Sequence, residues 1–213
     1  MRNTASWSGW PGGFGLTPTE LNSAYPFGQF SIPAGALQPA EGDPTISTAF
    51  TFPIANGATI PVQKFTPGIE TECYFVWQFK SDFMDAASLS LKIKPVWFQD
   101  VLGTGNVKWT AGAYVANIGD SLNVSNETNN QDQLCPARNA LYEQTGGDAI
   151  DGERAIDLGN IGGVSASGWN HVSILLERHG DEAEDTFNQE AILHGIGVQF
   201  KCDFNNIAEW PVP

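Results

Sequence analysis

The most closely spaced carboxylates in the sequence lie between two apolar stretches near the carboxyl end. They are Asp181, Glu182, Glu184 and Asp185. Carboxylate oxygens are hard ligands that suit Ca²⁺, but the run lacks the alternating aspartates and the glycine of a calcium-binding loop. Carboxylates in turns are ordinarily solvated. We therefore predict a wet acidic loop that Arg178 restrains, and no metal site.

The three histidines do not form a metal site by their spacing. His171, His179 and His194 include neither a His-x-His pair nor a His-Glu-x-x-His motif, so zinc is not indicated. His194 shares the parity of Ile192 and Ile196 in an alternating run. That parity predicts a hydrogen-bonded histidine in the core or at its boundary.

The cysteines are odd in number and far apart. Cys73, Cys135 and Cys202 suit neither a disulfide framework nor a Cys-x-x-Cys metal site. Cys73 and Cys202 lie in strand-like runs, where free cysteines are usually buried. We predict buried free thiols in a protein that folds in a reducing cytoplasm.

Paired carboxylates on a sheet could also hydrolyse glycosides, one as acid and one as base or nucleophile. Glu70, Glu72 and Glu177 lie in or near strand-like runs, but the sequence does not set their separation. Residues 163–168 carry serines between glycines at the wrong spacing for a nucleophile elbow. We predict no catalytic residues, no cofactor and no enzymatic activity.

The acidic loop is flanked by two runs with a period of two, which predict a long hairpin over 172–200. Val172, Ile174 and Leu176 point to one face, whereas Ser173 and Glu177 point to the other. Similar alternation occurs at 45–52, 73–80, 89–94 and 107–115, and shorter strands are expected at 139–143 and 154–158. About eight antiparallel strands predict an all-β, jelly-roll-like sandwich.

The composition agrees with one main domain preceded by an arm. The 213 residues are 41% hydrophobic and only 16% charged, with 23 glycines and 13 prolines, which favours short strands joined by tight turns. We place an extended arm at 1–40 and the sandwich at 41–213. A net charge of −14 argues against nucleic acid and anionic membranes as partners. The amino terminus lacks an apolar signal region, and no run approaches the roughly 18 apolar residues of a membrane span, so we expect a soluble, non-exported protein.

The arm concentrates aromatic residues among glycines and prolines. We predict interface contacts by Trp7, Trp10, Phe14, Tyr25 and Phe27, because exposed aromatics promote association. The alternative is a strap over the protein's own core. Thr17 and Pro18 have the chemistry of a helix start, with one or two turns before Pro26.

Several short motifs resemble, in order, a family of small β-sandwich structural proteins encoded by tailed bacteriophages. They are Ile32-Pro33-Ala34, Gly105-Asn106-Val107-Lys108-Trp109, Asn117-Ile118-Gly119-Asp120, Arg178 with Asp185-Thr186, and Leu193-His194-Gly195-Ile196. His179 stands where the family pattern has aspartate. The resemblance covers about half of the chain and leaves 1–30 and 121–168 unmatched.

The resemblance implies a virion component. Our first hypothesis is a capsid decoration or cement protein on the capsid exterior, made in the host cytoplasm, that binds the major capsid protein and copies of itself as a homotrimer or dimer. The second is a receptor- or carbohydrate-binding module of a phage fibre, with Trp97 or Tyr114 stacking on sugar rings. The third is a glycoside hydrolase.

Overall fold

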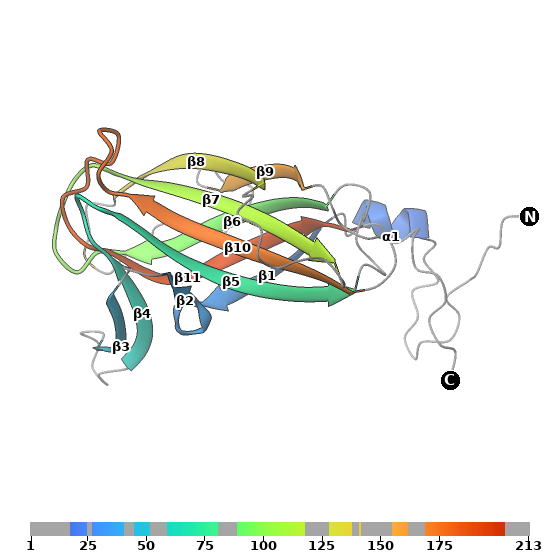
Figure 1. Ribbon diagram of the computed structural model, residues 1–213, viewed down its shortest axis with the longest axis horizontal. Coiled ribbons are helices and arrows are strands. Elements are labelled where there is room, and N and C mark those ends of the chain that lie inside the picture. The colour runs from blue at the N-terminus through green and yellow to red at the C-terminus, as the bar shows by residue number, and fades with distance from the viewer. Residues whose placement is uncertain are drawn as a thin grey trace, which may run out of the picture.

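The protein is an antiparallel β-sandwich of two facing sheets, as the computed structural model shows (Figure 1). The structure describes residues 18–24, 27–40, 45–51, 59–80, 89–117, 128–137, 141, 155–161 and 169–202. The predicted all-β, jelly-roll-like fold class is confirmed. These residues form eleven strands, more than the eight expected.

Sheet A has six strands and sheet B has five. The order in sheet A is β3 (Thr45–Thr51), β4 (Thr59–Phe65), β11 (Ala191–Lys201), β6 (Leu89–Phe98) and β9 (Ile156–Ile161), with β1 (Phe27–Pro33) also pairing with β11. The order in sheet B is β2 (Gln38–Pro39), β5 (Glu70–Lys80), β10 (Trp169–His179), β7 (Asn106–Asn117) and β8 (Thr128–Pro136).

Large aromatic side chains fill the space between the sheets. Trp97 of β6 and Trp109 of β7 are fully buried, with ring centroids 6.4 Å apart. Phe65 packs edge-on against Trp109 at 4.9 Å, and Phe187 packs against Trp97 at 5.5 Å. The small residues of β7, among them Ala111 and Ala113, leave room for these rings.

The second part of the predicted arm belongs to the sandwich. β1 pairs along β11, and Phe30 packs against Trp77 with ring centroids 4.8 Å apart. The 3₁₀ turn η1 (Ala34–Ala36) follows, and buried Gln63 donates to the carbonyls of Ala34 and Leu37. The expected boundary at residue 40 therefore moves to the start of β1, because apolar residues from Ile32 onward are buried in the core.

The helix start at Pro18 is confirmed by α1 (Pro18–Ala24), which Figure 1 places at the end of the sandwich opposite the β10–β11 connection. Of the predicted interface residues, Phe27 is the first residue of β1 and is 48% exposed. Trp7, Trp10, Phe14 and Tyr25 lie outside the described residues. Nowhere in the described part of the chain is a helix long and apolar enough to cross a membrane.

The strands expected from alternation at 45–52, 73–80, 89–94 and 107–115 coincide with β3, β5, β6 and β7. The segment 154–158 overlaps β9, whereas most of 139–143 lies outside the described residues. β8 was not predicted, because its sequence TNNQDQLCP lacks apolar alternation. It pairs with β7 at the edge of sheet B, where one row of side chains faces water.

The prediction for His194 is wrong. His194 is exposed, because the register of β11 against β6 shifts between Leu193 and Gly195. A bulge inserts one residue and reverses the parity of the residues that follow it. Gly195 comes close to β1 at the bulge: a Cβ there would lie 2.6 Å from the carbonyl oxygen of Ile32.

The acidic β10–β11 connection is only partly solvent-exposed. Asp185 is buried with Arg178, at side-chain exposures of 1% and 0%, whereas Asp181 and Glu184 are exposed, as predicted. Asp185 also accepts a hydrogen bond from the backbone N–H of Lys108. The prediction that Arg178 restrains this loop is confirmed, but it does so through a buried ion pair.

Candidate binding face on sheet B

The outer face of sheet B is defined by the alternation of β10. Val172, Ile174 and Leu176 are buried against sheet A. The intervening residues Ser173, Leu175, Glu177 and His179 therefore point to the opposite face. The register brings Tyr74 and Gly112 beside Leu175, and Val76 and Tyr114 beside Ser173. This face carries an aromatic part in the middle and a charged part at the end near the acidic loop.

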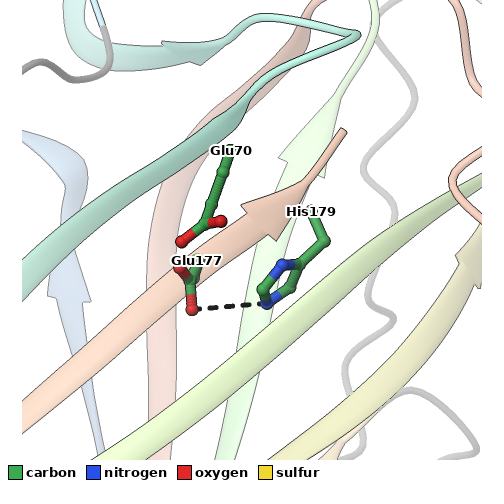
Figure 2. Close-up of side chains that lie close together, drawn as sticks. All are labelled: Glu70, Glu177 and His179. Carbon is green, nitrogen blue, oxygen red and sulfur yellow. Dashed lines mark ion pairs between the residues drawn. The ribbon is translucent and has the colours of Figure 1, made fainter. Parts of the chain in front are cut away.

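The charged part centres on Glu70, Glu177 and His179 (Figure 2). His179 lies directly opposite Glu70 across the β5–β10 pairing, and its Nε2 is 3.3 Å from the Glu177 carboxylate. Glu177 is 7% exposed although it is on the outer face. A hydrogen bond with Glu177 lowers the pKa of Glu70, and the charge of His179 lowers it further.

A second group of charges continues this cluster toward β7 and β8. The Lys108 ammonium contacts Glu182 and lies 3.2 Å from Asp132, which also accepts a 2.7 Å hydrogen bond from Thr110. The hydrogen bond from Thr110 and the neighbouring Lys108 lower the pKa of Asp132. The carboxylate of Glu182 in turn raises the pKa of Lys108. This group connects the acidic loop to the edge of sheet B.

The aromatic part of the face contains two tyrosines on opposite sides of β10. Tyr74 of β5 is 40% exposed and Val76 beside it is 45% exposed. Tyr114 of β7 is half-buried. The half-buried Ser173 and Leu175 of β10 lie between the two strands, and Gly112, which has no side chain, lies beside Leu175. Tyr74 therefore presents an exposed amphipathic ring, and Tyr114 lies on the same face of the sheet.

The structure separates the residues that we proposed for sugar stacking. Tyr114 is on the outer face of sheet B, but Trp97 is fully buried in the core. The prediction for Trp97 is therefore wrong, because β6 turns this ring toward Trp109 and Phe187. Tyr74 was missed. Its position in an alternating run with Val76 and Gln78 was the available signal, since Cys73 in the same run was expected inside.

The three glutamates proposed for glycoside hydrolysis do come together. Glu72 lies opposite Glu177, and Glu70 is hydrogen-bonded to Glu177. Hydrolysis requires carboxyl groups about 5–5.5 Å or about 6.5–9.5 Å apart, so that a sugar or a water fits between them. Hydrogen-bonded carboxyls leave no such space. The predicted absence of a catalytic pair stays a prediction, but the Glu70–Glu177 pair does not have the required geometry.

The remaining candidates are spread over the molecule. His171 lies on the outer face of β10, opposite Gln78, at the end away from the acidic loop. The three cysteines are free and buried, as predicted. A shallow hollow of about 290 Å³ lies at the loop end, between Pro67, Gly180 and Phe187. Its walls are the turns that hold the Arg178–Asp185 pair, so we assign it a structural role.

No family model matches the sequence, and no curated protein matches it. Among solved structures, the chain is similar to the low-affinity xylan-binding module CBM86 of Roseburia intestinalis, with 14% identity, a TM-score of 0.39, and coverage of 84% of this chain and 98% of that one. It is also similar to TmCBM61, solved with β-1,4-galactotriose (11% identity, TM-score 0.31, coverage 83% and 88%), and to the mannan-recognising module TmCBM27 (9%, 0.34, 87% and 92%). Similarity at this level concerns the β-sandwich fold class alone. The function therefore has to be argued from the chain's own residues.

Proposed function

We propose that this protein is a non-catalytic glycan-binding β-sandwich and that the outer face of sheet B is its binding surface. The observation that carries the proposal is the exposed Tyr74, which shares the outer face of sheet B with Tyr114 on the other side of β10, offset from it by two residues along the strands. A sugar ring has an apolar face of C–H groups and a rim of hydroxyls. An aromatic ring covers the first, and polar side chains around it bind the second.

The spacing of the tyrosines favours an extended chain of sugars. The strands of Tyr74 and Tyr114 flank β10, so the two residues are about 10 Å apart across the sheet at roughly 4.8 Å per strand spacing, and the register also offsets them by two residues along the strands. Ser173 and Leu175 of β10 lie between the two strands, and Gly112, which has no side chain, lies beside Leu175. A single monosaccharide does not bridge this width, whereas an oligosaccharide lying across the strands contacts both rings.

Polar side chains with hydrogen-bonding capacity surround the two rings. Gln38 of β2 lies opposite Tyr74, and Gln78 lies two positions beyond Val76 on the same face of β5. Both are exposed. Amides of this kind donate to and accept from sugar hydroxyls. Because the charged part of the face and the net charge of −14 are acidic, we expect an uncharged polysaccharide rather than an anionic one.

The test is a glycan array with the full chain, followed by calorimetric titration with the best oligosaccharide. We expect Tyr74→Ala to weaken binding about tenfold, or about 1.4 kcal/mol. The matched control is Phe27→Ala, which removes a ring of similar exposure from sheet A (48% against 40% for Tyr74) and should leave binding unchanged. An array with no ligand, or equal affinities for wild type and Tyr74→Ala, would contradict the proposal.

A second candidate is the capsid decoration protein implied by the phage resemblance, with the major capsid protein and further copies of the chain as partners. Its support is that two pairs of the motifs that carry the resemblance contact each other. Thr186 Oγ1 accepts a 2.9 Å hydrogen bond from the Asn106 N–H, and Pro33 pairs with Gly195. Phe27, one of the predicted interface residues, is exposed at the start of β1.

This candidate is tested by co-sedimentation with capsids that lack the protein. Because β1 begins at Phe27, the truncated chain should begin at residue 18, which keeps α1 and the whole sandwich. The full chain should co-sediment and the truncated chain should not. Co-sedimentation of neither chain would contradict the capsid function, and equal co-sedimentation of both would contradict a role for the arm.

A further inference from the structure

Three side chains on the outer face of sheet B converge as metal ligands do. Figure 2 shows Glu70 reaching from β5 toward Glu177 and His179, which extend from β10 on the same side of the sheet. One ligand atom from each lies within 4.8 Å of the other two. The set contains an imidazole as well as carboxylates, and it is held by two paired strands rather than by a loop.

The best-defined distance in the cluster matches the geometry of a tetrahedral site. Glu177 Oε2 and His179 Nε2 are 3.3 Å apart. Two ligands that each bind a metal at about 2.0–2.1 Å with a tetrahedral angle are separated by roughly 3.3 Å. Glu177 is 7% exposed and Glu70 is exposed. Buried Glu177 can act as the fixed ligand, while exposed Glu70 can move by the small amount that coordination requires.

The other nitrogen of His179 provides an independent indication. Its Nδ1 lies 3.5 Å from Glu182 Oε1. Histidines that bind a metal through one ring nitrogen commonly donate the other N–H to a carboxylate, which fixes the tautomer and the ring orientation. Glu182 is itself held by Lys108. The cluster therefore has three side chains that can bind the metal directly, and Glu182 contacts the ring nitrogen of His179 that faces away from it.

The charges around the cluster also favour a bound cation. Oxygen atoms of the Glu70 and Glu177 carboxyl groups lie within 4.8 Å of each other, and carboxylates this close repel when both are ionised. The nearby Lys108 ammonium contacts Glu182 and Asp132. The Arg178 guanidinium is on the inner face of β10, where Asp185 binds it. A divalent cation between Glu70 and Glu177 would relieve the repulsion directly.

We propose that Glu70, Glu177 and His179 form a binding site for a divalent transition-metal ion of the Zn²⁺ type, with Glu182 orienting His179 and water completing the coordination. The imidazole decides the class of metal, because Ca²⁺ and Mg²⁺ prefer sites made of oxygen ligands alone. The site lies on β5 and β10, beyond the two tyrosines, and does not depend on glycan binding. By bridging two strands it would stabilise the folded protein.

The test is calorimetric titration of the metal-free full chain with Zn²⁺, and separately with Ca²⁺ and Mg²⁺, together with the shift in Tm that each ion produces. We expect one Zn²⁺ per chain and a rise in Tm. Glu70→Gln and His179→Ala should each weaken Zn²⁺ binding at least about tenfold, and Glu182→Gln about 10- to 100-fold. Circular dichroism checks that each variant keeps the wild-type fold.

His171→Ala is the matched control, because His171 lies on the same strand and face at the other end of β10. It should bind Zn²⁺ as the wild type does. The proposal is overturned if Zn²⁺ binds no tighter than Ca²⁺, or if folded Glu70→Gln and His179→Ala both keep the wild-type affinity. Glycan binding is measured separately with Tyr74→Ala, so failure of one proposal leaves the other open to its own test.

Discussion

Arg178 and Asp185 form a bidentate ion pair that is almost completely shielded from solvent. Arg178 Nε and Nη2 donate to the two carboxylate oxygens at 2.9 and 2.8 Å. The remaining guanidinium protons reach the carbonyls of Phe65, Phe187 and Gln189. The pair thus joins the end of β4 to both ends of the β10–β11 connection. Asp185 also links this connection to β7, because it accepts a hydrogen bond from the Lys108 N–H.

We predict that breaking this pair strongly destabilises the fold. Asp185→Asn leaves a buried guanidinium without its counter-charge, which costs about 3–5 kcal/mol. Arg178→Met leaves a buried carboxylate and should cost a similar amount. The double variant Arg178→Met/Asp185→Asn should lose less than the sum of the two single variants, with a coupling of about 2–3 kcal/mol. Urea denaturation measures all three free energies of unfolding.

Glu184→Gln is the control for this series, because Glu184 is an exposed carboxylate in the same loop. It should change the free energy of unfolding by no more than about 0.5 kcal/mol. Additive losses in the double variant would show that the two charges do not stabilise each other.

Two glycines with positive φ should differ in their tolerance of alanine. Gly68 has φ +77° and open space around the missing Cβ, so Gly68→Ala should cost only the backbone strain of about 1–2 kcal/mol. Gly105 has φ +121°, and a Cβ there would lie 2.5 Å from the carbonyl oxygen of Thr186. Gly105→Ala must therefore also displace the loop backbone and should cost clearly more. Equal melting temperatures for the two variants would contradict this account.

Cys73 should make stability depend on alkaline pH. Burial, together with the nearby Glu72, raises the pKa of this thiol in the folded state. Because the unfolded thiol has a pKa near 8.5, the unfolded state loses its proton first. The thiol's contribution is therefore fully present below about pH 8.5 and falls by about 1.4 kcal/mol per pH unit above it.

Cys73→Ala removes this titration, so the difference in stability between wild type and Cys73→Ala should shrink between about pH 8.5 and pH 10. Urea denaturation at several pH values gives that difference. Ile174→Val is the control, because Ile174 is equally buried in sheet B and has no titratable group. A penalty for Cys73→Ala that is as independent of pH as that for Ile174→Val would refute the prediction.

For the glycan-binding face, the ring of Tyr74 should matter more than its hydroxyl. Stacking on a sugar requires the aromatic surface, which Tyr74→Phe retains. We expect the Phe variant to keep most of the wild-type affinity and Tyr74→Ala to lose about tenfold. Calorimetric titration with the oligosaccharide selected on the array distinguishes them. If both variants lose binding equally, the contact is a hydrogen bond through the hydroxyl rather than stacking.

The strands and the fold class could be predicted because they depend on local patterns. The alternation of Val172, Ile174 and Leu176 shows directly which side of β10 is buried. The same rule failed at His194, because the one-residue bulge between Leu193 and Gly195 leaves no trace in the spacing of apolar residues. It also failed for β8, a polar edge strand without a periodic signal.

The candidate sites were less predictable, because they join strands that are distant in the sequence. Glu70 and His179 become neighbours only through the register of β5 with β10. Tyr74 and Tyr114 share one face of the sheet only because both of their strands pair with β10. A one-residue change of register would turn either set to the other face. The sequence by itself therefore determined an acidic, all-β protein with buried thiols and alternating strands. Only the tertiary structure decided which polar and aromatic side chains share a surface, since that depends on pairings made across the whole chain.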